Sequence, residues 1–280
     1  SPDELSGVDF DVLFICTDYN NGNRIYMRLK DTDIDMKKIR FLNRMDAIED
    51  SWDYDIQDDK SIISKIGNVK IRERFLTDFD IVTEIFVMNT YYFHIPADEI
   101  VVIDMGMNIG AASLYFAKMR NVVSVYGFEP FPDTYQQAVD NFALNTNFIK
   151  NKIHPFNVAV TDKEEIKLVA VSAEQTGWRN IFCNDNDKTR VEIQCIPAVN
   201  IVSGIIEKNL GRKIVMKIDV EGAEFIIFDN LAKTNLLESV DVILMEYHES
   251  PKVITDVLEQ YGFKYAVTGK NRFGILYAFK

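Results

Sequence analysis

The chain has 280 residues, enough for one large domain or for one domain with an appendage. Its composition, 47% hydrophobic and 12% aromatic, can fill a substantial core and is not that of a disordered chain. The net charge of −12 argues against a nucleic-acid partner or an anionic membrane, because both are bound through a surplus of lysine and arginine.

Cysteines and histidines are few. The three cysteines, Cys16, Cys183 and Cys195, form no CxxC pair, and an odd number in an acidic chain favours reduced thiols and a cytoplasmic protein. The presence of only three histidines argues against a multi-histidine zinc site, so we predict no resident metal. Since no apolar run approaches the roughly 18 residues of a membrane helix, we expect neither a membrane span nor a signal peptide.

Residues 1–80 are predicted to form an accessory region. Alternating apolar residues on both sides of Asn21-Gly22 indicate a β-hairpin. Residues 46–60 carry seven acids in fifteen positions but lack the glycine and the closing glutamate of a calcium-binding EF-hand loop, so we predict a solvated loop. The apolar segment 79–93 leads into the rest of the chain.

Residues 81–280 show strand-like and helix-like patterns in alternation. Apolar runs typical of buried strands predict an α/β domain with a mostly parallel seven-stranded sheet covered on both faces by helices. The last two runs are joined by a short polar turn, so we expect an antiparallel hairpin strand at the C-terminal end of the sheet. A further antiparallel pair is predicted as an insertion at 166–172 and 190–196. The expected strands of the main sheet are 101–105, 122–129, 154–160, 214–219, 241–246, 263–268 and 273–279, and the expected helices are 109–119, 133–145, 222–237 and 251–260.

A glycine-containing loop follows the first strand of this domain. Its sequence, Asp104-Met-Gly106-Met-Asn108-Ile-Gly110, lies at the carboxyl end of a strand, where open parallel sheets bind their ligands. Glycine permits a positive φ and a close approach of the backbone to a ligand. The loop lacks the G-x-G-x-x-G spacing of dinucleotide sites. Its order, acid-x-Gly-x-(Gly or Asn)-x-Gly, is typical of S-adenosylmethionine enzymes of the Rossmann-like class.

Glu129 gives a second indication of the ligand. It follows the next strand, 25 residues after Asp104. A carboxylate at this place can accept hydrogen bonds from the hydroxyl groups of a ribose. Acids at two successive strand ends, with the glycine loop between them, predict an adenosyl ligand.

Five motifs stand in order between about residues 80 and 250: VVIDMGMNIGAASLYFAK, VYGFEPFPDTYQQAVDNFALN, NVAVTD, MKIDVEGAEF and ILMEYHE. Together they resemble the FkbM family of S-adenosylmethionine-dependent methyltransferases. The resemblance implies a Rossmann-like class I methyltransferase fold, S-adenosyl-L-methionine as cofactor, and O-methylation of a hydroxyl on a sugar, a glycan or glycolipid, or a polyketide-type small molecule. The cofactor-binding positions that it implies are Asp104, Gly106, Asn108 and Gly110 around the methionine end, Glu129 at the ribose, Phe131 beside it, and Ala159 near the adenine.

Methyl transfer to an alcohol needs a group that removes the hydroxyl proton. The fifth strand ends in Glu246 and His248, and the fourth ends in Asp219 and Glu221, so these side chains are expected around the reacting methyl group. We predict His248 as the base because imidazole accepts a proton near pH 7, with Asp219 orienting acceptor or cofactor. Glu246 orients the histidine, or acts alone if burial raises its pKa. Asp219, Glu246 and His248 could instead form a metal site. Glu224 is interpreted as a partner of the helix dipole, and Trp178-Arg179 could cover a sugar ring or pack at the edge of the core.

Two other functions remain open on the sequence. A nicotinamide-dependent oxidoreductase would share the fold and Glu129, but Ser113 stands where its third glycine is expected. A relative that binds the cofactor without turnover is the non-enzymatic alternative.

Overall fold

The computed structural model describes residues 13–15, 25, 28–29, 39–41, 52–171, 181, 189–269 and 273–280. The chain divides into two compact units, Ser1–Met88 and Asn89–Lys280. The sequence places the boundary at residue 80, whereas the first unit of the structure extends to Met88, since residues 81–86 continue a helix that begins before them.

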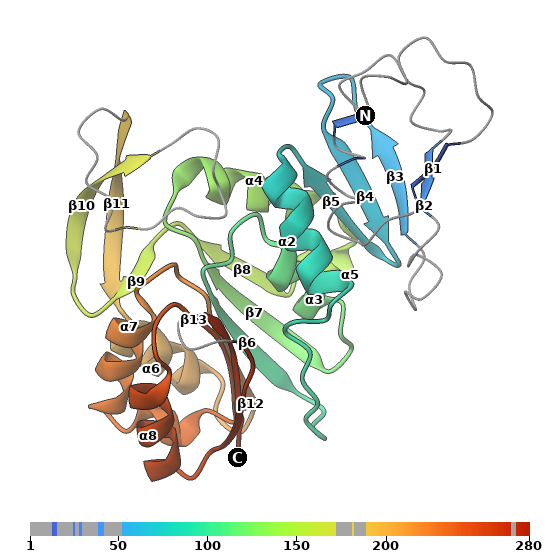
Figure 1. The fold of residues 1–280 in the computed structure, drawn as a ribbon. Coiled ribbons are helices and arrows are strands. Elements are labelled where there is room, and N and C mark those ends of the chain that lie inside the picture. Colours follow the sequence, from blue (N-terminus) through green and yellow to red (C-terminus); the bar gives the residue numbers. More distant parts are fainter. Residues whose placement is uncertain are drawn as a thin grey trace. The chain divides into compact units, whose positions relative to one another are not determined.

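The first unit contains a three-stranded antiparallel sheet followed by a helix. Strands β3 (Trp52–Ile56), β4 (Ile62–Ile66) and β5 (Val69–Glu73) pair in the order β3-β4-β5, and helix α2 (Leu76–Phe86) follows them (Figure 1). Buried residues alternate along β4 and β5, as in strands with one face on a core. Two short strands, β1 (Leu13–Ile15) and β2 (Ile39–Phe41), form a separate parallel pair.

Two predictions for this unit are wrong. The acidic segment 46–60 is not a loop throughout, because Trp52–Ile56 forms β3, whose aromatic side chains stack on Phe79 of α2. The three described residues between 25 and 29 are helical instead of lying in the second strand of a hairpin. A short run of alternating apolar residues does not distinguish strand from helix, which explains this error. The predicted Asn21-Gly22 turn lies outside the described residues.

The second unit is built on a seven-stranded sheet with the order β14-β15-β13-β12-β6-β7-β8. Neighbouring strands are parallel, except that β15 is antiparallel to both β13 and β14. The predicted fold class is confirmed. The strands are β6 (Ile100–Met105), β7 (Val122–Phe128), β8 (Ile153–Phe156), β12 (Lys213–Ile218), β13 (Val242–Tyr247), β14 (Lys264–Val267) and β15 (Gly274–Phe279).

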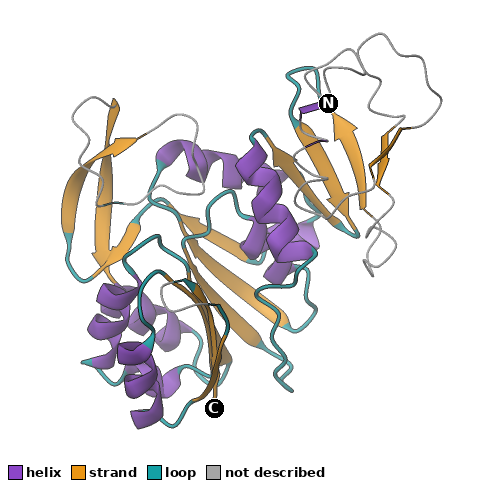
Figure 2. Ribbon diagram, viewed as in Figure 1, coloured by secondary structure: helices purple, strands orange, loops and turns teal. Residues whose placement is uncertain are grey.

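Helices lie on both faces of this sheet (Figures 1 and 2). Helices α3, α4 and α5 pack against β6, β7 and β8, while α6, α7 and α8 form the other layer. Every residue of β6 is buried, and so is β12 after its first residue, because both lie in the middle of a sheet that is covered on its two faces. The helices are α3 (Ala111–Ala117), α4 (Pro132–Ala143), α5 (Asn147–Lys150), α6 (Ala198–Lys208), α7 (Glu224–Ala232) and α8 (Lys252–Gln260), with a 3₁₀ helix, η4, at Leu236–Ser239.

The predicted strand 154–160 is divided into two. Its first part is β8 of the main sheet, and its second part, β9 (Ala159–Thr161), belongs to a different sheet. The side-chain amide of Asn157 lies at the division and donates to the carbonyl oxygens of Glu129 (2.8 Å) and Pro130 (3.0 Å). These bonds tie the interruption to the turn after β7, so the strand cannot continue straight.

The second sheet of this unit has the order β10-β11-β9. Strand β10 (Glu165–Val171) is antiparallel to β11 (Thr189–Pro197), which confirms the predicted inserted pair, and β9 adds to β11 in parallel. Helix α6, which follows β11 directly, was not predicted from the sequence.

The strand order locates the ligand-binding edge of the main sheet. Strand β6 lies between β12 and β7, and the chain adds strands on one side of β6 up to β8 before it crosses to the other side. Open α/β sheets bind ligands beyond the carboxyl ends of the strands at such a switch point. The loops after β6, β7, β12 and β13 meet at this edge because these four strands are parallel.

Candidate active site

The loop between β6 and α3 runs very close to the end of β12. Gly106 and Gly110 have φ values of +79° and +86°, and Asn108 between them has +50°. A Cβ atom on Gly106 would lie 1.7 Å from the carbonyl oxygen of Asp219, and one on Gly110 would lie 2.4 Å from the ring of Phe142. Both glycines are therefore required by their backbone conformation and by the absence of space for a side chain.

Asp104 lies beneath this loop. Its side chain is fully buried, accepts a hydrogen bond from Oγ of Ser113 (2.7 Å), and forms an ion pair with Nζ of Lys217 (3.1 Å). The two carboxylate oxygens of Asp104 contact protein side chains that support the loop. That Asp104 belongs to the loop around the methionine end of the cofactor stays a prediction.

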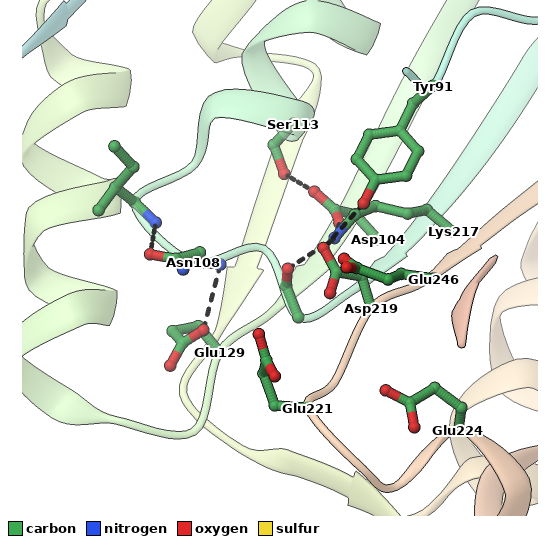
Figure 3. A network of polar contacts seen from close by, with 12 residues as sticks. Tyr91, Asp104, Asn108, Ser113, Glu129, Lys217, Asp219, Glu221, Glu224 and Glu246 are labelled. Carbon is green, nitrogen blue, oxygen red and sulfur yellow. Dashed lines mark hydrogen bonds and ion pairs between the residues drawn. The ribbon is translucent and has the colours of Figure 1, made fainter. Parts of the chain in front are cut away.

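Lys217 is the centre of the same buried network. Its ammonium group donates to the carbonyl oxygen of Gly106 (2.7 Å) and lies 3.4 Å from Oδ2 of Asp219, and its side chain is 2% exposed. Burial alone would lower the pKa of Lys217, but the negative charges of Asp104 and Asp219 outweigh it, so the pKa is raised. A charged lysine thus links the glycine loop to the end of β12 (Figure 3).

Glu129 lies at the carboxyl end of β7, where the sequence places it. It is 5% exposed; Oε2 accepts a hydrogen bond from the backbone N–H of Asn108 (3.1 Å) and Oε1 accepts one from that of Phe131 (3.0 Å). These bonds fix the carboxylate beside the glycine loop. Because a carboxylate has about four acceptor positions, it can receive ribose hydroxyls as well.

Phe131 and Ala159 belong to an apolar cluster with residues of β10 and β11, including Cys195. We predicted that Ala159 ends the third strand of the main sheet. Instead it lies in β9, where it pairs with Cys195 of β11. Both residues are buried in this cluster, and a contact of either with the cofactor remains a prediction.

Asp219, directly after β12, is held by three side chains. Oη of Tyr91 donates to Oδ2 of Asp219 (2.8 Å), Lys217 pairs with the same oxygen, and Glu246 is hydrogen-bonded to the carboxyl group. Burial would raise the pKa of Asp219, but the charge of Lys217 and these hydrogen bonds lower it. Asp219 is therefore an ionised group in a fixed position.

His248, directly after β13, lies between carboxylates. Its Nδ1 is 3.0 Å from Oε1 of Glu224, while its Nε2 is 3.3 Å from Oε2 of Glu221 and 4.0 Å from Oε1 of Glu246. The hydrogen bond with Glu224 raises the pKa of His248, against the opposing effect of burial. The hydrogen bond to the ring is made by the buried Glu224, which the sequence does not indicate, while Glu246 lies farther away and is also bonded to Asp219. An orienting role of Glu246 stays a prediction.

No group of three or more histidine, cysteine, aspartate or glutamate side chains in the described part of the chain is arranged to hold a metal ion. Asp219, Glu246 and His248 are thus not placed as a set of metal ligands in the structure. The predicted stacking pair Trp178-Arg179 lies outside the described residues.

The sequence analysis missed two residues of this site. Lys217 had a signal, since a lysine inside the apolar run of a central strand is rare unless it is paired. Tyr91 had none, because it is 128 residues away from Asp219 in the chain. Glu224 was noticed only for its place in the first turn of α7.

Comparison with known proteins identifies the family. The sequence profile described as "Methyltransferase FkbM domain" matches residues 104–265, more than half of the chain. The chain belongs to the FkbM methyltransferase family. No curated protein matches it.

Among solved structures, the chain is similar to the methyltransferase FkbM from Methylobacillus flagellatus KT, with 13% identity and a TM-score of 0.44 over 71% of this chain and 48% of the other. This chain thus spans about half the length of that protein. It is also similar to the precorrin-6y C5,15-methyltransferase from Geobacter metallireducens GS-15, with 12% identity and a TM-score of 0.37 over 73% and 88% of the two chains. In the part of the chain that the structure describes, no helix has the length and apolarity that a membrane crossing requires.

Proposed function

We propose that the protein is an S-adenosylmethionine-dependent O-methyltransferase that acts on a hydroxyl group of a sugar, a glycan or glycolipid, or a polyketide-type small molecule. The acceptor class follows from the family resemblance. We further propose that the protein is cytoplasmic and that its first unit is an accessory domain.

The placement of Glu129 is the observation that carries this proposal. Its nearly buried carboxylate is fixed by backbone N–H groups from the glycine loop and from the turn after β7. A carboxylate in this position suits the two adjacent hydroxyl groups of a ribose. The acids Asp219 and Glu221 at the same edge suit the positive charges of a sulfonium and an ammonium group (Figure 3). The residues present therefore fit the cofactor.

The protein's own contribution to catalysis is alignment and proton removal. Bound S-adenosylmethionine would supply an activated methyl group, so the chain mainly has to hold the acceptor oxygen in line with it. The buried network of Lys217, Asp104 and Asp219 keeps the glycine loop in one conformation. Proton removal falls to the group of side chains around His248, the residue that the sequence predicts as the base.

Calorimetric titration with S-adenosylhomocysteine, S-adenosylmethionine and NAD tests the proposal. We expect the two sulfur compounds to bind and NAD not to bind. Glu129→Ala should weaken S-adenosylhomocysteine binding by about 10- to 150-fold, because hydrogen bonds to a charged group contribute about 1.5–3 kcal/mol. The exposed Glu164 provides the matched control, Glu164→Ala, which should bind normally.

Turnover is then measured as S-adenosylhomocysteine release with methyl glycosides of glucose, galactose and rhamnose as acceptors. Binding of NAD alone, or equal affinity of the Glu129→Ala variant and the unmodified protein, would contradict the proposed function.

A further inference from the structure

The loop after β12 holds Glu221 in an uncommon backbone conformation. The φ of Glu221 is +52° and that of Gly222 is +101°, so two consecutive residues are left-handed. Such a conformation in a non-glycine residue costs about 1–3 kcal/mol and is found most often at functional sites. Its side chain is 29% exposed and lies at the sheet edge that also carries Glu129 and Asp219 (Figure 3).

Glu221 is the outer member of a chain of three side chains. Its Oε2 is 3.3 Å from Nε2 of His248, and Nδ1 of His248 is 3.0 Å from Oε1 of Glu224. Glu224 is fully buried, and its two oxygens accept the backbone N–H of Gly222 at 3.0 and 3.1 Å. The ring of His248 is therefore fixed from the buried side by Glu224, and its other nitrogen faces Glu221.

The other acids of this edge are engaged elsewhere. The carboxyl group of Asp219 is bound by Tyr91, Lys217 and Glu246, and Asp104 lies beneath the glycine loop. Glu221 differs from these acids in its partner. Among the described residues, the structure shows an ion pair of Glu221 with His248.

We propose that Glu221 is the catalytic base and that His248, held by Glu224, is the residue that positions it; this inference rests on the proposed function. A carboxylate oxygen of Glu221 takes the proton of the acceptor hydroxyl as the acceptor oxygen forms its bond to the methyl carbon. The carbon–sulfur bond breaks and its electron pair stays on sulfur, so the products are a methyl ether, a neutral thioether and a protonated Glu221.

The electrostatic surroundings of Glu221 agree with this role. Burial and the negative charge of Asp219 raise its pKa to about 7, Glu224 adds to the increase, and His248 and Lys217 act against it. A base whose pKa lies near the working pH combines a large ionised fraction with a useful affinity for the proton. The hydrogen bond with Glu224 raises the pKa of His248, which favours the imidazolium form, and that form has no free nitrogen to accept a proton.

Substitution of Glu221 gives the direct test. With whichever methyl glycoside is accepted, Glu221→Gln should lower kcat by about 10²- to 10⁴-fold. The affinity for S-adenosylhomocysteine should stay within about threefold of the unmodified protein, because Glu129 and the glycine loop are unchanged. Glu221→Asp should keep part of the turnover. The matched control is Glu249→Gln, an exposed acid one residue after His248, which should turn over normally.

The pH profile separates a positioning role of His248 from a merely structural one. In the unmodified protein kcat/KM should rise with pH, with the midpoint of the rise at about pH 7, as Glu221 ionises. His248→Gln removes a positive charge that lowers the pKa of Glu221, so the same rise should move to higher pH. Glu246, which lies 4.0 Å from Nε2 of His248, should give no such shift when changed to Gln.

Turnover of Glu221→Gln within about threefold of the unmodified protein would overturn the assignment. If the unmodified protein turns over none of the glycosides, the proposed O-methylation of sugars fails, and NMR titration of the histidines decides the inference separately. The chain has three histidines, so the His248 signal can be assigned by one substitution. Its titration midpoint should fall in Glu221→Gln, because the charge of Glu221 raises it; an unchanged midpoint contradicts the proposed pair.

Discussion

Replacing Lys217 by methionine tests whether the buried network supports the glycine loop. The substitution keeps most of the side-chain volume but removes a charge that is 2% exposed and pairs with Asp104 at 3.1 Å and Asp219 at 3.4 Å. Asp104 is fully buried and would keep only the hydrogen bond from Ser113, while the carbonyl oxygen of Gly106 would lose its donor. Removing one partner of a buried ion pair costs about 3–5 kcal/mol. Asp219 is partly exposed and keeps its hydrogen bond from Tyr91, so we expect it to contribute little to the loss of stability.

Urea denaturation of the protein, followed by circular dichroism, measures this loss of stability. Asp104→Asn in the Lys217→Met background removes the unpaired charge and should restore at least about half of the lost stability. The pKa of Lys217 in the folded protein is raised above its ordinary 10.5. The contribution of the charged lysine to folding stability should therefore be complete below pH 10.5 and should disappear as the pH rises through the pKa of the folded state. A loss below about 1 kcal/mol, or a double variant no more stable than the single one, would refute the reasoning.

Two further substitutions test the site. Gly106→Ala should weaken S-adenosylhomocysteine binding at least about 10-fold in calorimetry, since its Cβ would lie 1.7 Å from the carbonyl oxygen of Asp219 at a φ of +79°. Gly204→Ala, in α6 with nothing within 4 Å of the added atom, should leave binding unchanged and stabilise the protein by about 0.5–1 kcal/mol. Glu224→Gln should lower the pKa of His248 from its raised value toward the ordinary 6.5, as followed by NMR. A histidine with a raised pKa stabilises the fold fully below pH 6.5 and less as the pH rises above it. The variant should therefore lose stability mainly at acidic pH.

Much of the second unit could be predicted because its strands are local patterns. The run 101–105 reads as a buried strand without any knowledge of its partners, and the structure places all of β6 in the core. The break at Asn157 could not be predicted in the same way. The sequence on both sides of Asn157 has the pattern of one continuous strand. The hydrogen bonds that interrupt this strand go to backbone carbonyl oxygens 27 and 28 residues earlier.

The site shows the same division. Gly106, Gly110 and Glu129 follow from spacing, because a strand end, a glycine turn and the next strand end are neighbours in the chain as well as in space. The partner of His248 does not follow from spacing: Glu246 is two residues away, yet Glu224, 24 residues away, makes the hydrogen bond. Alternation along a strand places side chains on one face but does not state what the neighbouring loop brings to that face.

The sequence by itself therefore determined the fold class, the family and the sheet edge that carries the candidate site, since each depends on residues that are close along the chain. The tertiary structure decided which acids support the glycine loop and which lie around His248. The ionisation of Asp219 and Glu221 depends on burial and on the charged side chains that the fold places beside them.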